Sequence, residues 1–287
     1  MKKRSIVTVL LIAAMALTLL AGCGGNGGGA QSGTNAGNNQ DNGALIPFVI
    51  GATPVPHTEV LEFVQDKMAA EGIDMQIRTF TDFVQPNLAT QSGELDANYF
   101  QHVPYMTNFN ESHGTNMVSL FAVHFEPLGL YKARARSIDE LTSGAIIAIP
   151  NDPTNGARAL NLLEATGLIT LREGAGILAT RLDIIDNPLN LDIRELEAAQ
   201  LPHILPDVHM AVINGNFALQ AGLEMGVDSV AAEERDSISA VTYANHIVVR
   251  EGNENDERVQ TLIRILGSDE VRDFINTTYE GRVVPVF

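Results

Sequence analysis

Arg158 is the side chain in this sequence best suited to hold an anionic group. It follows Asn151 and Asp152, which can cap a helix, and it lies about one and a half turns into the helix that Pro153 is expected to open. A planar guanidinium grips a carboxylate through two parallel hydrogen bonds. The alternative is an arginine on the protein surface, and the motif alone leaves both interpretations open.

A second motif combines aromatic and hydrogen-bonding side chains. It runs from Asp96 to Tyr105, contains Phe100 and His102, and follows a segment that contains Phe83. In open α/β proteins, ligands gather beyond the carboxyl ends of the strands, so this motif predicts the wall of a pocket. Alternatively, Phe100 and Tyr105 belong to the hydrophobic core and His102 caps a turn.

Two asparagines stand at comparable places. Asn214 directly follows the apolar run that ends at Ile213, and Asn245 lies where the chain enters another extended run. Asparagine at such places is more often a turn or cap residue than a ligand-binding residue. These two positions therefore predict binding only in combination with the motifs above.

Apolar runs that alternate with helical periods must position these motifs. The expected strands are Ala44–Gly51, Met75–Phe80, Ala145–Ile149, Val208–Ile213 and Val241–Arg250. The expected helices are His57–Ala70 with Val60, Leu61, Val64 and Met68 inward, Pro153 to about Thr166 before Gly167, and Asp256–Leu266 with Val259, Leu262, Ile263 and Leu266 inward. Such alternation predicts an α/β fold, and continuous apolar strands favour parallel sheets that are covered on both faces.

Two long extended stretches suggest a hinge. They are Met117–Tyr131 and Thr242–Arg250, and a self-contained α/β block separates them. We therefore expect two lobes that close on a ligand: residues 44–128 together with 245–287 form the first lobe, and residues 129–244 form the second.

The first 23 residues have the layout of an export signal. Basic residues at positions 2–4 precede an apolar run from Ile6 to Leu20, and small residues then lead to Cys23. The run is shorter than the roughly 20 residues of a permanent membrane-spanning helix, so a cleaved signal over residues 1–22 is expected. The alternatives are an ordinary secretory signal and an uncleaved anchor. Residues 23–43 are then a flexible tether, because their Gly, Asn, Gln and Ser content prevents folding.

Charge and cysteine content exclude several classes of protein. The formal net charge is −17, and the three basic residues of the signal contribute +3, so the remaining chain carries −20. An acidic chain of this kind argues against binding to nucleic acid and against a basic patch for anionic lipids. Cys23 is the only cysteine, so stability must come from packing without an internal disulfide.

Taken together, the motifs resemble the methionine-binding lipoproteins of ABC importers, also called the NlpA lipoprotein family. The resemblance spans the whole chain. It rests on the four residues ending at Cys23, Asp96–Tyr105, Glu126–Tyr131, Pro150–Asp152 with Arg158, Ile213–Asn214, Tyr243–Asn245 and Ser268–Val271. It implies a lipidated Cys23, a location on the extracytoplasmic face of a bacterial cell membrane, and a two-lobed periplasmic-binding-protein fold of the second type.

The resemblance also implies a ligand and its binding residues. An amino acid, usually methionine, would lie between the lobes of a monomer and pass to the permease and ATPase complex of the importer, without a cofactor, a bound metal or enzymatic activity. The residues implied to bind it are Phe83, Phe100, His102, Tyr105, Arg158, Asn214 and Asn245. Arg158 would hold the carboxylate, and Asn214 and Asn245 the amino and carboxylate groups. The family member compared has tyrosine where this chain has Phe83, so one hydroxyl is absent here.

Energetics also give Arg158 the largest role in binding an amino acid. Burying a methionine side chain contributes roughly 1.5 to 3 kcal/mol, whereas micromolar affinity needs about 8 kcal/mol. Recognition of the charged groups must supply the rest. Replacing Arg158 by alanine is therefore expected to abolish binding and to leave the stability of the empty protein nearly unchanged. The acidic group Glu233–Asp236 is expected to form an exposed loop, and contact with the membrane permease is the alternative that the sequence leaves open.

Three other functions remain open at this point. A metal-ion-binding lipoprotein is disfavoured because His102 and His113, like His203 and His209, lack i, i+4 spacing. An exported enzyme is disfavoured because no nucleophile elbow or phosphate-binding loop is present. A binding lipoprotein for another amino acid, a dipeptide or a sulfur compound is the closest competitor.

Overall fold

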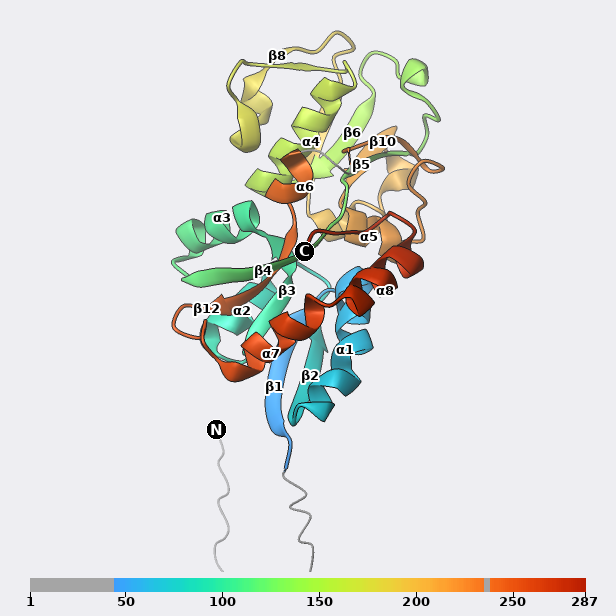
Figure 1. Ribbon diagram of the computed structural model, residues 1–287. Coiled ribbons are helices and arrows are strands. Elements are labelled where there is room, and N and C mark those ends of the chain that lie inside the picture. Colours follow the sequence, from blue (N-terminus) through green and yellow to red (C-terminus); the bar gives the residue numbers. More distant parts are fainter. Residues whose placement is uncertain (1–43, 235–237) are drawn as a thin grey trace, which may run out of the picture. The chain divides into compact units, whose positions relative to one another are not determined.

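Two mixed sheets, each with its own helices and hydrophobic core, make up the part of the chain that the computed structural model describes, residues 44–234 and 238–287 (Figure 1). This arrangement confirms the two-lobed α/β fold predicted from the sequence. The predicted signal, Cys23 and the whole predicted tether lie outside the described residues.

The first lobe is built on a six-stranded sheet with the order β13-β4-β12-β3-β1-β2. Its strands are β1 (Ile46–Ala52), β2 (Ile73–Thr79), β3 (Ala97–His102), β4 (Met117–Phe125), β12 (Asn245–Arg250) and β13 (Val284–Pro285). Its helices are α1 (Glu59–Ala70), α2 (Gln85–Ser92), α3 (Val103–His113), α7 (Glu257–Leu266) and α8 (Asp269–Tyr279). Strand β1 runs parallel to β2 and β3, whereas β12 is antiparallel to β3 and β4.

The second lobe is built on a five-stranded sheet with the order β11-β5-β10-β6-β9. Its strands are β5 (Gly129–Lys132), β6 (Ile146–Pro150), β9 (Asp192–Leu196), β10 (Met210–Ile213) and β11 (Ser229–Ala232), beside a small pair β7 (Thr170–Leu171) and β8 (Ile184–Asp186). Its helices are α4 (Pro153–Ala165), α5 (Gly215–Gln220) and α6 (Ile238–Thr242). Strand β6 lies parallel to both β9 and β10.

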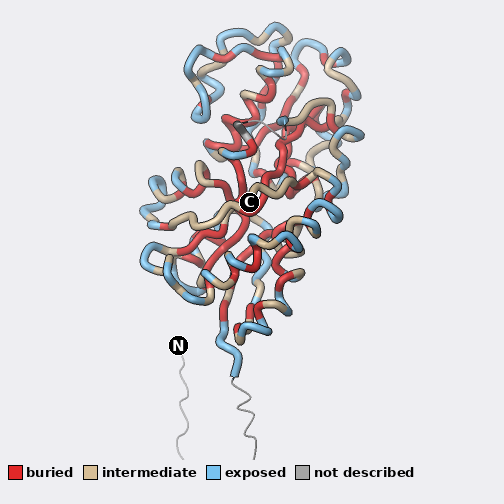
Figure 2. The backbone as a smooth tube through the Cα atoms, in the orientation of Figure 1, coloured by how far each residue is buried: buried red, intermediate tan, exposed pale blue. Residues whose placement is uncertain are grey.

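The predicted apolar faces form the two cores. On α1, all four residues expected to face inward are buried: Val60, Leu61, Val64 and Met68. They pack with the first sheet and with α7 and α8, and a separate core joins α4 to the second sheet. In Figure 2, buried residues follow the strands and exposed residues lie on the outer turns of the helices.

Three strands end where three helices begin, and this alignment creates the site. Strand β3 ends at His102 and leads into α3, β6 ends at Pro150 just before α4, and β10 ends at Ile213 just before α5. Asp152 caps α4 by accepting a hydrogen bond from the Asn155 amide at 2.9 Å. As the rule for open α/β sheets predicts, polar side chains from both lobes gather at these strand ends.

The chain passes between the sheets twice. Residues 126–128 link β4 to β5, and the stretch from Glu233 to Ala244, which includes α6, links β11 to β12. The second crossing differs from the prediction of a continuous strand over Val241–Arg250. Val241 is 78 % exposed, and only from Asn245 onward does the chain find a partner strand on each side, so the strand begins there.

One inward face is displaced from the prediction. On α7, Val259, Leu262 and Leu266 are buried as expected. The fourth buried residue is Ile265, whereas Ile263 was expected to face inward. Ile263 is only partly buried against the first core. The buried face of α7 follows Val259, Leu262 and Ile265, which are spaced three residues apart, so Ile263 lies at the margin of that face.

Candidate functional site

All seven side chains implied to bind a ligand line one cavity between the lobes. They are Phe83, Phe100, His102, Tyr105, Arg158, Asn214 and Asn245. Five further residues complete the wall: Gln101, Glu126, Asn155, Gly215 and Asn216. The space between these residues, including its opening to solvent, is about 340 Å³.

Aromatic rings form the apolar part of the cavity wall. The ring of Phe83 lies 5.7 Å from that of Phe100, 5.8 Å from that of Tyr105 and 4.9 Å from that of Phe217, measured between centroids. The Tyr105 hydroxyl donates a hydrogen bond to the Phe83 backbone carbonyl oxygen at 3.0 Å, which ties the Tyr105 side chain to the backbone of Phe83. Phe100 and Tyr105 also belong to a small buried cluster, so the core interpretation of these residues holds alongside their place in the wall.

Arg158 is buried and held on several sides. Its guanidinium carbon lies 4.2 Å from the ring centroid of Tyr243, a cation–π contact. Nη1 donates to Asn155 Oδ1 at 3.2 Å, and Nη2 donates to the Glu126 carbonyl oxygen at 3.4 Å. Only 4 % of the side chain is exposed, so the surface-arginine alternative is wrong.

Glu233 is the charge partner of Arg158. Nε and Nη2 of Arg158 donate to its two carboxylate oxygens at 3.0 and 2.5 Å, and the Leu128 amide donates to the same carboxylate at 2.8 Å. The side chain is 10 % exposed, so the prediction of an exposed acidic loop is wrong at this residue. Glu233 is buried because the second crossing, in which it lies, packs against Leu128 of the first crossing. Asp236 lies outside the described residues.

Asn155 joins the polar groups of the cavity. Its Oδ1 accepts hydrogen bonds from Arg158 Nη1 and from Asn214 Nδ2, the latter at 3.0 Å, and lies 3.1 Å from His102 Nε2. Its own amide nitrogen donates to Asp152. One oxygen therefore holds three predicted site residues in a fixed relation.

Two buried amide atoms in the wall have no hydrogen-bond partner within residues 44–234 and 238–287. They are Asn214 Oδ1, an acceptor, and Asn216 Nδ2, a donor. Leaving such atoms unpaired costs roughly 1 to 3 kcal/mol each. A bound molecule that carries both a donor and an acceptor would satisfy them.

Glu126 adds a second carboxylate to the wall. Its Oε1 accepts from His124 Nε2 at 2.7 Å, and it also accepts from the Asn216 backbone amide. Burial raises the pKa of Glu126 to about 7, and nearby His57 and Arg158 oppose that rise. A side chain on Gly215 would come within 2.7 Å of the Glu126 Cβ, so glycine is required for this close approach of α5.

His102 both lines the cavity and caps α3. The Tyr105 amide donates to its Nδ1 at 3.1 Å, so the neutral ring carries its hydrogen on Nε2 and donates it to Asn155. Burial lowers the pKa of His102 to about 3, and the charge of Arg158 lowers it further while Asn155 opposes the shift. Protonating Nδ1 would break the helix cap.

We expect the pKa of His102 to make folding stability fall in acid. Between pH 7 and 5 the unfolded ring, with an ordinary pKa of 6.5, takes up a proton, whereas the folded ring with its pKa near 3 does not. The contribution is complete above pH 6.5, declines toward pH 3, and amounts to about 2 kcal/mol between pH 7 and 5. Urea unfolding of the wild type and of His102→Gln at both pH values measures it, and the variant should lose about 2 kcal/mol less. Equal losses would contradict the assignment.

The sequence motifs missed several residues that the structure places at the site. In the sequence, Glu126 stands out only within the family resemblance, and no motif assigns a binding role to Asn155, Gln101 or Gly215. A helical signal existed for Asn155, since it stands three residues before Arg158 and so shares its face. For Glu233 no local signal exists, because its partner lies 75 residues away.

The residue predicted to be lipidated, Cys23, lies outside the described residues. Within the described ranges, no helix has both the length and the apolar character needed to cross a bilayer.

Comparisons with known proteins identify the family. The family model described as NlpA lipoprotein matches residues 48–287. The membrane lipoprotein TpN32 of Treponema pallidum is 42 % identical over 81 % of this chain and 85 % of its own length, and the D-methionine-binding lipoprotein MetQ of Salmonella typhimurium is 41 % identical over 83 % and 86 %. A nutrient-binding protein from Burkholderia cenocepacia, solved bound to methionine, has a TM-score of 0.79 and 41 % identity, covering 84 % of this chain and all of the other. The chain therefore belongs to the NlpA lipoprotein family.

Proposed function

We propose that this protein is a solute-binding lipoprotein that captures an amino acid, above all methionine, between its two lobes and delivers it to an ABC importer. The observation that carries the proposal is the composition of a single cavity wall. A buried guanidinium, unpartnered amide atoms and three aromatic rings line the same space. The methionine-bound relative and the MetQ relative support the same ligand class.

The charged ends of an amino acid match the polar residues of the wall. In the proposed complex, the ligand carboxylate meets Arg158 and the Asn216 amide nitrogen. The ligand ammonium meets the free oxygen of Asn214, with Asn245 and Glu126 beside it. Hydrogen bonds to charged groups contribute roughly 1.5 to 3 kcal/mol each, so three or four of them supply what side-chain burial lacks.

The aromatic part of the wall suits a thioether. A methionine sulfur near an aromatic edge gains about 0.3 to 1.5 kcal/mol beyond its burial. Phe83, Phe100 and Tyr105 present such edges and also accept other apolar side chains of similar length. The serious alternative is therefore a different amino acid, a dipeptide or a sulfur compound in the same cavity.

Calorimetry on the full chain purified in detergent tests the proposal. After removal of any co-purified ligand, which mass spectrometry identifies, the protein is titrated with L-methionine, D-methionine, leucine and glutamine. We expect binding of methionine in at least one stereochemical form, and weaker binding of leucine. Heat from none of the four amino acids would remove the proposal, and a preference for glutamine would replace methionine as the ligand.

Replacing Phe83 by alanine should weaken methionine binding about tenfold or more, because one of the three aromatic walls of the side-chain pocket is lost. Phe83→Leu is the matched control, since it keeps the apolar volume and removes only the ring. We expect an intermediate affinity for that variant. Titration with alanine, which does not reach the rings, should give the same affinity in all three proteins. An equal loss for alanine would place Phe83 away from the ligand side chain.

Further parts of the proposal concern location and partners. We propose lipid attachment at Cys23, residence on the extracytoplasmic face of the membrane, and action as a monomer that docks on the permease and its ATPase complex without catalysing a reaction. We also propose that residues 44–128 and 245–287 move against residues 129–244 as the cavity closes. The two chain crossings and the naming of the TpN32 relative as a membrane lipoprotein support these points.

A further inference from the structure

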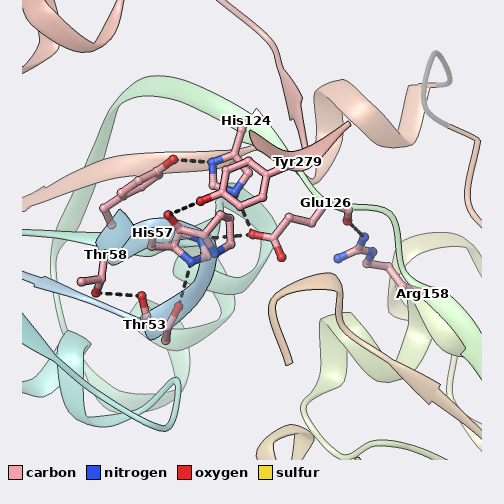
Figure 3. Close-up of polar contacts among 9 residues, drawn as sticks. Thr53, His57, Thr58, His124, Glu126, Arg158 and Tyr279 are labelled. Carbon is pink, nitrogen blue, oxygen red and sulfur yellow. Dashed lines mark hydrogen bonds and ion pairs between the residues drawn. The ribbon is translucent and has the colours of Figure 1, made fainter. Parts of the chain in front are cut away.

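Three side chains of types that can bind a metal ion meet beside the cavity wall at Glu126. His57 comes from the turn before α1, His124 from the end of β4, and Glu126 from the first crossing. One ligand atom from each lies within 4.8 Å of the others, and all three side chains are buried. Figure 3 shows both imidazole rings beside the Glu126 carboxylate, with Arg158 beyond it.

An oxygen atom holds the outer nitrogen of each ring. His57 Nδ1 lies 2.8 Å from Thr53 Oγ1, and His124 Nδ1 is hydrogen-bonded to the Tyr99 hydroxyl. Histidines that bind metals have this pattern, in which an oxygen partner holds the outer nitrogen and fixes the ring. Each ring therefore presents its Nε2 toward Glu126.

His57 Nε2 is the unexplained atom of the cluster. It lies 3.4 Å from Glu126 Oε1, yet in the part of the chain that the structure describes it has no hydrogen-bond partner, and it is buried. Asn245 lies near enough to raise the pKa of His57, but its side chain does not meet the geometry of a hydrogen bond to His57 Nε2. A lone pair or an N–H held in this position without a partner is costly unless a further group binds there.

We propose that His57 Nε2, His124 Nε2 and a Glu126 carboxylate oxygen bind one divalent transition-metal ion, with Zn²⁺ as the best match. Two imidazoles and one carboxylate form a ligand set that zinc accepts, with a fourth position left for water or another molecule. Because Glu126 also lines the cavity, that position opens toward it. The ion would fix the first crossing to the first lobe.

Binding requires one change in the hydrogen-bond arrangement. His124 Nε2 donates to Glu126 Oε1 at 2.7 Å in the empty cluster, so its hydrogen must move to Nδ1, where the Tyr99 hydroxyl oxygen accepts it. The ring stays neutral in this tautomer, and the metal takes the freed lone pair. For metal–ligand distances near 2.0 to 2.1 Å, the ligand atoms must lie roughly 3.3 Å apart. His124 Nε2 and Glu126 Oε1 must therefore separate from 2.7 Å, and the two histidine ligand atoms, which lie within 4.8 Å of one another, must approach.

Metal analysis of the full chain in detergent tests this proposal independently of the amino-acid ligand. After treatment with a chelator, the protein is titrated with Zn²⁺ and with Co²⁺, whose visible absorption reports its coordination. We expect one ion per chain, a tetrahedral cobalt spectrum, and loss of both in His57→Gln and in His124→Gln. His203→Gln, at an exposed histidine of the second lobe, is the matched control and should keep the ion.

A crystal soaked in zinc decides the matter even if the histidine variants fail to fold. Anomalous density between His57, His124 and Glu126 in the wild-type protein would support the proposal. Anomalous density only at surface histidines, no uptake by the chelated protein, or full retention of the ion in both histidine variants would overturn it. Methionine binding is measured in the same samples, so failure of the metal site does not bear on the proposed function.

Discussion

Arg158→Ala should lose methionine binding about 100-fold or more and should also destabilise the empty protein by about 3 to 5 kcal/mol. The loss of affinity follows from removing the buried guanidinium that would face the ligand carboxylate, whose Nη1 keeps one N–H beyond the bonds to Glu233, Asn155 and the Glu126 carbonyl oxygen. The loss of stability follows from the structure, because Glu233 would remain 10 % exposed and without its cation. The prediction from sequence that stability stays nearly unchanged is therefore replaced.

Calorimetry and urea unfolding together measure both effects. Arg172→Ala is the matched control, because Arg172 is 62 % exposed and pairs with Asp183 at the surface, where an ion pair contributes little to stability. A double variant, Arg158→Met with Glu233→Met, removes both charges and should recover stability without recovering binding. Recovery of binding in the double variant, or full affinity in Arg158→Ala, would show that the carboxylate is held elsewhere.

Local sequence patterns were sufficient to predict the elements that build the site. The proline and the Asp152 cap at the start of α4, the four-residue apolar face of α1 and the continuous apolar run of β6 all depend on neighbours within a few residues. The same logic placed the aromatic motif and Asn214 at strand ends. Strand ends in such folds face a common edge, so local reasoning extended to the cavity.

Local patterns could not predict which side chains that are distant in the sequence contact one another in the fold. Glu233 and Arg158 are 75 residues apart, and the histidines at 57 and 124 come from different elements. Screening for metal ligands by helical spacing overlooked that pair, because a turn and a strand end have no shared period. The acidic run at Glu233 looked like a solvated loop because only the folded chain brings it against Leu128.

We expect the Arg158–Glu233 pair also to influence which charge state of ligand the cavity accepts. Arg158 already has Glu233 as its counter-ion, and Glu126, whose pKa burial raises to about 7, lines the same wall. A zwitterion adds no net charge to this environment, whereas a monoanion adds one. An unpaired charge within about 5 to 6 Å changes binding by roughly 1 to 3 kcal/mol at the effective dielectric constant of a protein site.

Glu233→Gln should therefore narrow the preference for methionine over its α-hydroxy analogue, a monoanion without the ammonium group, about tenfold or more. Glutamine keeps an oxygen for Arg158 but removes the negative charge, and Asn155 and Tyr243 still hold the guanidinium. Calorimetric titration of both ligands into the wild type and the variant measures the ratio of affinities. Glu140→Gln, an exposed carboxylate of the same lobe, is the matched control and should leave the ratio unchanged. If the ratio is the same in Glu233→Gln, the pair only positions Arg158 and does not select the charge of the ligand.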